Sequence, residues 1–285
     1  MSRNKDRLGT GTPPTDNSPP PQLLQQETQG FSFVVPTEFV ELPSGGRYYP
    51  EGHPLHGAES IEIKQMTAKE EDILTSANLI RKGTVLDKLF QSLIVSPINY
   101  NDLLIGDKNA VMIAARILGY GKNYSFELTC PECGTKNNVD TDLTELGNSD
   151  FDEDVLSDQG ENGYIEWELP NSKRKITFKI PTHQIEEKVR KEMDARRKMS
   201  KNGVDPEITT RFKHMILSVD GNDEKKYITN FVDNEFLSRD SFEFRKYLGT
   251  IQPDVKFNIE TSCPECDFTG EAALTIDAGF FWPQS

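Results

Sequence analysis

The sequence predicts an α+β protein with a helical N-terminal unit, a split four-cysteine zinc ribbon and an inserted α/β region. Three observations support this fold class: two separated Cys-Pro-Glu-Cys motifs, apolar stripes at helical spacing before the first motif, and alternating apolar residues beside both motifs. Separate helical and strand patterns in one chain are typical of α+β folds. The expected parts are an arm over 1–30, a mainly helical unit over 31–125, a split ribbon over 126–140 with 256–285, and an inserted region over 141–255.

The expected arm has the composition of a segment that is disordered in isolation. Between Gly9 and Gln26 the only large apolar residues are Leu23 and Leu24, and prolines and glycines lie among polar residues. Such a segment buries too little apolar surface to offset the entropy lost on ordering. Two interpretations stay open: a solvated tail, or an extended arm that becomes ordered against a partner.

The mainly helical unit follows. Thr67 and Glu70 have the spacing of a capping box, which predicts the start of a helix. Apolar residues at helical spacing predict that this helix ends near Gly83, that a second ends before Pro97, and that a third spans about 101 to 118. Burying the apolar stripes of these helices would form a compact core.

The inserted region begins with an acidic stretch over 150–158, which indicates a linker or loop. Apolar and polar residues then alternate over 165–169 and 176–180, as expected for the two strands of a hairpin. Three further segments predict helices, at 185–199, 208–219 and 233–247.

The two Cys-Pro-Glu-Cys motifs contain every cysteine of the chain. A tetrahedral structural zinc site takes four thiolates at about 2.3 Å from the metal, and two CxxC turns supply that number with none left over. Each motif lies between alternating runs, which predicts a strand, a thiol-bearing turn and a second strand. Zinc is the predicted metal and iron the alternative, because four sulfurs suit both. The predicted ligands are Cys130, Cys133, Cys263 and Cys266.

The spacing of the motifs leaves a second arrangement open. From Cys133 to Cys263 is 263 − 133 = 130 positions, far more than in a local zinc ribbon. Each motif could instead recruit ligands elsewhere, and His53 and His56 have the spacing of an HxxH pair. Pro54 and the glycines around these histidines favour a surface loop instead.

Charge and missing motifs exclude several classes of function. The net charge is 32 − 46 = −14, which disfavours attraction to nucleic acids and anionic membranes and fits protein partners. No signal peptide and no long apolar run is indicated, so we expect reduced cysteines and no membrane insertion. Four thiolates would close the coordination shell of a metal, and neither a P-loop nor a GxSxG motif is present, so we expect no enzymatic activity.

Several blocks between Phe39 and Tyr124 resemble a bacteriophage family. They are Val40–Pro50 (VELPSGGRYYP), Ile61–Leu74 (IEIKQMTAKEEDIL), Leu79–Gly83 (LIRKG), Leu103–Asp107 (LLIGD) and Ala114–Gly121 (AARILGYG). In order and spacing these blocks are similar to the baseplate hub and hub-assembly proteins of T-even-type contractile-tail phages. The C-terminal half carries less of the resemblance.

The resemblance implies a structural or assembly component of the tail baseplate, without catalytic residues to carry over. It implies other baseplate or tail proteins as partners, and a location in the virion tail baseplate, with the host cytoplasm as the place of assembly. Retention in the virion and transient action during assembly both stay open. The expected contact regions are the Pro-rich arm and an aromatic end, Phe280 to Trp282, for which core packing is the alternative.

Two other hypotheses remain at this point. A zinc-ribbon nucleic-acid-binding protein, such as a transcription factor, would need a local basic patch and would bind DNA in a salt-dependent way. A metalloenzyme would need a metal with an open coordination position.

Overall fold

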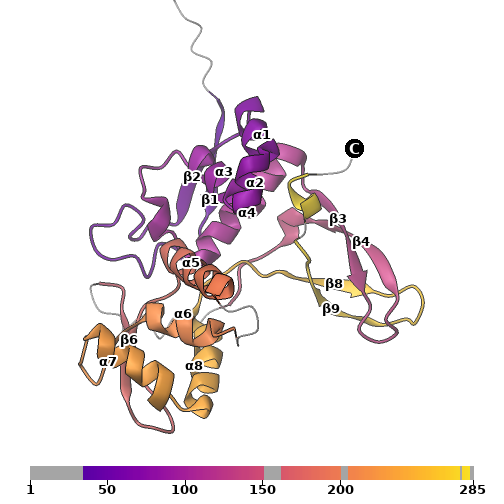
Figure 1. Ribbon diagram of the computed structural model, residues 1–285. Helices are drawn as coiled ribbons and strands as arrows, with labels where there is room; N and C mark the ends of the chain where they lie inside the picture. Colours follow the sequence, from indigo (N-terminus) through magenta and orange to yellow (C-terminus); the bar gives the residue numbers. More distant parts are fainter. Residues whose placement is uncertain (1–34, 151–161, 200–204, 277, 283–285) are drawn as a thin grey trace, which may run out of the picture. The chain divides into compact units, whose positions relative to one another are not determined.

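The computed structural model describes residues 35–150, 162–199, 205–276 and 278–282. The chain divides into two units, Met1–Val34 and Val35–Ser285, and the following description concerns the second. This unit combines helices with small antiparallel sheets, which confirms the α+β class (Figure 1). The expected arm and most of the acidic stretch over 150–158 lie outside the described residues.

The first sheet contains two antiparallel strands, β1 (Thr37–Glu41) and β2 (Ser60–Lys64). The long loop between them is anchored by the buried carboxylate of Asp107. This carboxylate accepts hydrogen bonds from the backbone N–H and hydroxyl of Ser44, at 3.0 and 2.7 Å, and from the hydroxyl of Tyr49 at 2.7 Å. These three donors offset part of the cost of burying a carboxylate, although burial still raises the pKa of Asp107.

A group of helices follows β2. The predicted start at Thr67 is confirmed, since the Glu70 carboxylate accepts the Thr67 backbone N–H at 2.9 Å. The single helix predicted up to Gly83 is divided, because the backbone at Ser76 is extended. Ile80 therefore turns outward and is 48% exposed. The helices are α1 (Ala68–Thr75), α2 (Ala77–Lys82), α3 (Val85–Leu93), the short η1 (Tyr100–Asp102) and α4 (Ile105–Tyr120).

The helix predicted over 101–118 begins later, at Ile105, because the backbone of Leu103 and Leu104 is extended. Gly106 lies in the first turn of this helix. A Cβ at Gly106 would lie 1.9 Å from the carbonyl oxygen of Pro253, so this turn packs directly against a distant stretch of backbone. Glycine is required there by close approach and not as a helix breaker.

The inserted region contains a three-stranded antiparallel sheet in the order β5-β6-β7. The predicted hairpin is confirmed as β5 (Ile165–Glu168) and β6 (Lys175–Phe178). The helix predicted over 208–219 is wrong beyond Met215, since the next four residues form β7 (Ile216–Val219) against β6. The apolar residues of such a short segment fit the helical period and the strand period equally well. Pairing with β6 decides in favour of a strand.

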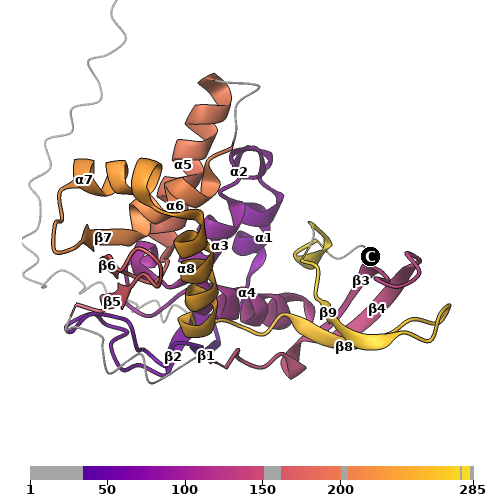
Figure 2. The ribbon, with the colours of Figure 1, turned by 90° about the horizontal axis from the view of Figure 1, so that it is seen from below.

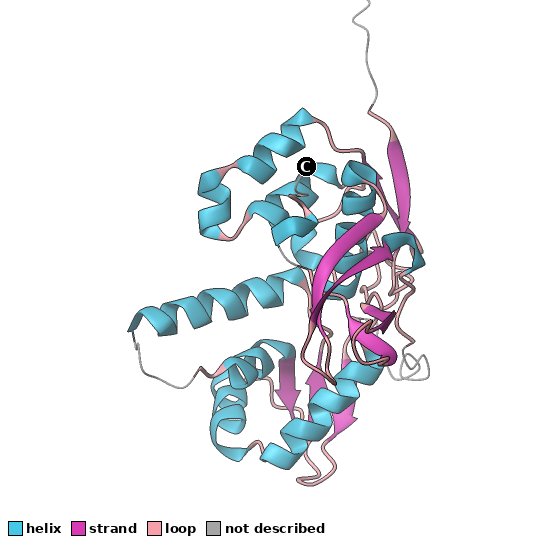
Figure 3. Ribbon diagram, turned by 90° about the vertical axis from the view of Figure 1, so that its right-hand side faces the viewer, coloured by secondary structure: helices cyan, strands magenta, loops and turns pink. Residues whose placement is uncertain are grey.

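Helices flank this sheet. They are α5 (His183–Met199), α6 (Glu207–Met215), α7 (Lys225–Asn230), the π-helical turn η4 (Phe231–Glu235) and α8 (Ser238–Ile251). The helix predicted over 233–247 thus begins at Ser238, after the π-helical turn. Figures 2 and 3 show that the C-terminal half of α5 projects beyond its neighbours, and residues 194–198 are exposed. In the described ranges, none of the helices has the length and apolar character needed to cross a bilayer.

Two further hairpins lie side by side (Figures 1 and 2). One is β3 (Asn123–Thr129) with β4 (Lys136–Asp142), followed by the short η2 (Leu143–Glu145). The other is β8 (Asn258–Ser262) with β9 (Thr269–Ala273). Both follow the predicted order of strand, cysteine-bearing turn and strand.

The aromatic end belongs to the core. Phe280, in the short η5 (Ala278–Phe280), and Phe281 are both buried. The Phe280 ring packs edge-on against Tyr124 at 5.0 Å between centroids, and Phe281 lies 6.2 Å from Phe90. The Trp282 indole N–H donates to the Leu74 carbonyl at 3.1 Å. Core packing is therefore the correct alternative, and the expected exposed contact surface is wrong.

Candidate metal centre

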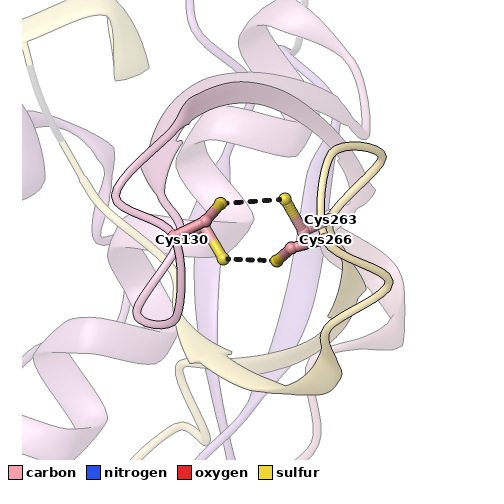
Figure 4. Close-up of side chains that lie close together, drawn as sticks. Cys130, Cys263 and Cys266 are labelled. Carbon is pink, nitrogen blue, oxygen red and sulfur yellow. Dashed lines mark hydrogen bonds between the residues drawn. The ribbon is translucent and has the colours of Figure 1, made fainter.

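Each of the two cysteine-bearing turns has the same backbone closure. The backbone N–H of Cys130 donates to the carbonyl of Thr135 at 2.8 Å, and the N–H of Cys263 donates to that of Phe268 at 2.8 Å. The two motifs thus form equivalent turns at the ends of their hairpins. Each turn projects two thiols toward the other hairpin (Figure 4).

The four sulfur atoms gather in one small volume. Cys130 Sγ lies 3.7 Å from Cys266 Sγ, and Cys133 Sγ lies 3.7 Å from Cys263 Sγ. All four sulfurs lie within 4.8 Å of one another. A tetrahedral site with metal–sulfur bonds of about 2.3 Å places its ligands roughly 3.8 Å apart. A disulfide bond is only about 2.05 Å long, so these separations fit a shared ion and not covalent pairs.

The first and second cysteines of each motif differ in exposure. Cys130 and Cys263 are buried, whereas Cys133 and Cys266 are exposed. The second cysteine of each motif therefore lies on the solvent side of the cluster, with its sulfur still directed at the other three. An ion could enter from the solvent side without opening the core.

Donors around the sulfurs favour the thiolate form at two cysteines. The pKa of Cys133 is lowered to about 6, first by the hydroxyl and backbone N–H of Thr135. The backbone N–H of Glu265 lowers the pKa of Cys263. The Asn137 amide, which donates to Cys263 Sγ at 3.3 Å, lowers that pKa further. Such N–H donors orient the ligands and stabilise the thiolate charge of metal sites.

Cys266 shows the opposite tendency. The backbone N–H of Phe268 lowers the pKa of Cys266, but desolvation and the neighbouring thiols outweigh it and raise the pKa to about 12. Each thiolate that forms makes the next more costly, because like charges in one small volume repel. A divalent cation supplies the charge that would let all four sulfurs ionise together.

The histidine pair does not belong to this cluster. The His53 ring stacks on Tyr49 at 4.7 Å between centroids, and His56 Nδ1 lies 2.7 Å from the Tyr49 carbonyl oxygen. Both histidines therefore fasten the loop between β1 and β2. The alternative in which each motif recruits separate histidine ligands is wrong, since the sulfurs of the two motifs meet.

A second polar cluster was missed by the sequence reasoning. Asp87, His183 and Glu187 each place one potential ligand atom within 4.8 Å of the others. The ammonium group of Lys108 lies 3.1 Å from Asp87 Oδ1 and 3.3 Å from His183 Nδ1, and Tyr100 donates to the same Asp87 oxygen. A lysine thus occupies the position where a cation would bind. His183 and Glu187 lie on one face of α5, but Asp87 comes from α3 and Lys108 from α4, so no single motif contains the whole cluster.

Comparison with protein families gives a match over most of the chain. The model of the T4 bacteriophage base plate protein family matches residues 35–282. The chain belongs to this family. Comparisons with curated proteins and with solved structures gave no match. The expected phage baseplate relationship is confirmed, and its narrower assignment to the hub stays a prediction.

The base plate family match extends well beyond the blocks that first indicated it. Those blocks lie between Phe39 and Tyr124, whereas the matched range also contains the inserted region, both hairpins and all four cysteines. The candidate metal centre is therefore inside the family region, not in an appended segment.

Proposed function

We propose that this protein is a structural or assembly component of a contractile-tail phage baseplate, acting at the hub through contacts with other baseplate or tail proteins. The observation that carries the proposal is the base plate family match over residues 35–282. The described helices, small sheets and anchored loops form a scaffold. Its place of action would be the virion tail baseplate, reached from the host cytoplasm during assembly.

The four cysteines would hold one structural zinc ion. The sulfur separations of 3.7 Å support tetrahedral coordination by Cys130, Cys133, Cys263 and Cys266. With four thiolates bound, the ion would have no open position for substrate or water, so a structural role is favoured over a catalytic one.

The zinc would stabilise hairpins that are weak on their own. Every residue of β8 and β9 is exposed or only half-buried, and a two-stranded hairpin is marginally stable in water. Binding of structural zinc contributes on the order of 10 kcal/mol in zinc-finger peptides. The ion would therefore join 126–140 to 256–285 as one split zinc ribbon and fix the ends of the inserted region.

The charges on the hairpins favour protein partners over nucleic acid. The lysines there are neutralised in part by carboxylates: Lys136 lies 2.6 Å from Glu127, and Lys256 lies 3.9 Å from Glu271. Glu132 and Glu265 lie within the cysteine turns. A nucleic-acid-binding ribbon would need an uncompensated basic surface to contact phosphates.

The metal assignment can be tested on the purified full chain. Elemental analysis should find one zinc per chain, and Cys263→Ser should lose it while the neighbouring Ser262→Ala retains it.

The function can be tested by complementing a phage that lacks this gene product, with tails counted by electron microscopy. Normal tail numbers without the protein would contradict the baseplate proposal, and mass spectrometry of purified virions would separate a virion component from a transient assembly factor.

A further inference from the structure

The sheet formed by β1 and β2 has one covered edge and one open edge. On the covered edge, the carbonyl of Glu62 accepts the Val95 N–H at 2.9 Å, and the Glu62 N–H donates to the Ser96 hydroxyl at 3.0 Å. On the other side of the sheet, β1 pairs with no further strand among the described residues (Figure 1). The open edge is therefore the outer side of β1.

The register identifies the backbone groups that face outward. The Leu42 N–H donates to Glu59, and the Gln65 N–H donates to Pro36, which places even-numbered residues of this segment in hydrogen-bonded pairs with β2. In an antiparallel pair the intervening residues direct their N–H and carbonyl groups away from the partner strand. These outward residues are Thr37, Phe39 and Glu41, and no hydrogen bond joins their backbone to any described residue outside β1.

Most side chains of this edge are also exposed. Phe39 is 71% exposed, the highest value among the exposed large hydrophobic residues of the described ranges. Four of the five residues of β1 are exposed, so the strand is held by its backbone bonds to β2 and, on the core side, by Val40 alone. An exposed aromatic residue at the centre of an open strand edge is a feature of strand-addition sites.

Charge determines which partner fits. Glu38 and Glu41 form no ion pair with any described residue, and β1 contains no basic residue. A second copy of β1 paired on Phe39 would bring four glutamates together on one ribbon of a chain that already carries a net charge of −14. In that register the two copies of Glu38 lie diagonally across the strands, and their repulsion, added to that of the net charge, disfavours self-pairing.

We propose that β1 is a docking edge for an extended segment of another protein, which adds a strand through Thr37, Phe39 and Glu41. The docked segment carries an apolar side chain that covers Phe39 and lysine or arginine residues beside Glu38 and Glu41. Within the proposed function this partner is another tail protein, and the docking site itself is independent of the zinc site. An extended segment of that kind gains backbone hydrogen bonds and specific side-chain contacts together.

The first test uses the full chain and a synthetic peptide, Thr-Lys-Val-Phe-Lys-Val-Thr, which sets its lysines opposite Glu41 and Glu38 when its Phe pairs antiparallel with Phe39. Amide hydrogen exchange measured by NMR should show fast exchange at Thr37, Phe39 and Glu41 in the free protein and protection when the peptide is added. Glu38 and Val40 should be protected in both states, because their N–H groups already face β2. Absence of peptide binding, or protection at a site away from β1, would overturn the proposal.

Two variants make the test specific. Phe39→Pro removes one outward donor and the aromatic side chain, and should weaken peptide binding at least tenfold while the circular dichroism spectrum is kept. The double variant Glu38→Lys and Glu41→Lys leaves the backbone intact and should prefer the same peptide with glutamate in place of lysine. The double variant Asp223→Lys and Glu224→Lys, which makes the same change of net charge in a distant loop, should keep the original preference.

Two outcomes would show that the interpretation is wrong. An unchanged charge preference in the double variant would mean that β1 does not select the partner. A dimer in sedimentation experiments that is lost with Phe39→Pro would assign the edge to self-association. Neither outcome would affect zinc content or complementation, so failure here is distinguishable from failure of the baseplate proposal.

Discussion

Asp267 occupies, in the second cysteine turn, the position that Gly134 occupies in the first, and both have a positive φ, 55° and 73°. This left-handed conformation is common for glycine and tolerated by aspartate, but it costs most other residues roughly 1–2 kcal/mol. The two equivalent turns therefore meet the same backbone requirement with different residues.

This equivalence predicts unequal effects of substitution. A Cβ at Gly134 would meet nothing within 4 Å, so Gly134→Ala adds only the conformational cost and should destabilise the hairpin by about 1 kcal/mol. Asp267→Gly should change stability by less than about 0.5 kcal/mol, because relief of strain offsets the added freedom of the unfolded chain. Urea unfolding of the zinc-loaded protein measures both, and equal losses would contradict the shared turn geometry.

Metal removal should loosen the hairpins and spare the helices. When the proposed zinc is extracted with a chelator, amides of β8 and β9 should lose protection from hydrogen exchange by on the order of 100-fold, because the ion carries much of their stability. Amides of α3, whose Leu89, Phe90 and Leu93 are fully buried, should change little. Loss of protection throughout α3 would show that the ion stabilises the whole core.

Glu70 should make stability depend on acid pH. Although burial alone would raise the pKa of Glu70, hydrogen bonds from Lys64, Ser92 and Thr67 lower it from 4.5 to about 2. Because the folded carboxyl binds its proton less readily than the unfolded one, its contribution is fully present above pH 4.5 and is lost as the pH falls toward 2. The shift corresponds to roughly 3 kcal/mol.

The corresponding experiment compares unfolding free energies between pH 6 and pH 3. Glu70→Gln should be destabilised at pH 6, and its difference from the native sequence should shrink as the pH falls. Glu71→Gln, a neighbouring exposed carboxylate, provides the matched control and should follow the native pH dependence. A pH-independent difference would mean that Glu70 acts by packing and not by its charge.

Two glycines should respond to alanine in opposite directions. Gly106→Ala places a Cβ 1.9 Å from the Pro253 carbonyl oxygen, so the first turn of α4 must move away and we expect a loss above about 2 kcal/mol. Gly249 lies within α8 with nothing within 4 Å of its Cβ position, so Gly249→Ala should stabilise by about 0.5–1 kcal/mol. Thermal unfolding of both variants checks the contrast.

The clustering of the four sulfurs could be predicted because the chain has so few cysteines. The chain has only four cysteines, and two CxxC motifs supply the four ligands of one tetrahedral ion. The two motifs could therefore be paired despite the long stretch of sequence between them. Ligation by Cys130, Cys133, Cys263 and Cys266, and the identity of zinc, stay predictions. The α+β class followed from the different periods of the helical and strand segments.

Other features depended on tertiary contacts that periodicity does not contain. The break at Ser76 and the strand from Ile216 arise where neighbouring elements override a continuous apolar pattern. The aromatic end allowed both exposure and burial until the partner rings, Tyr124 and Phe90, were in place. The anchoring carboxylate of Asp107 gave no signal, because its donors lie some sixty positions earlier in the chain.

The pairing of Cys130 with Cys266 imposes an order of events during synthesis. The ribosome would complete α1 to α4 and the first thiol pair long before the second pair emerges, and helical contacts close in sequence form fastest. A nascent chain that stopped before residue 263 would carry half a coordination shell. Zinc capture would thus come last, so that only chains translated through the final hairpin acquire the ion.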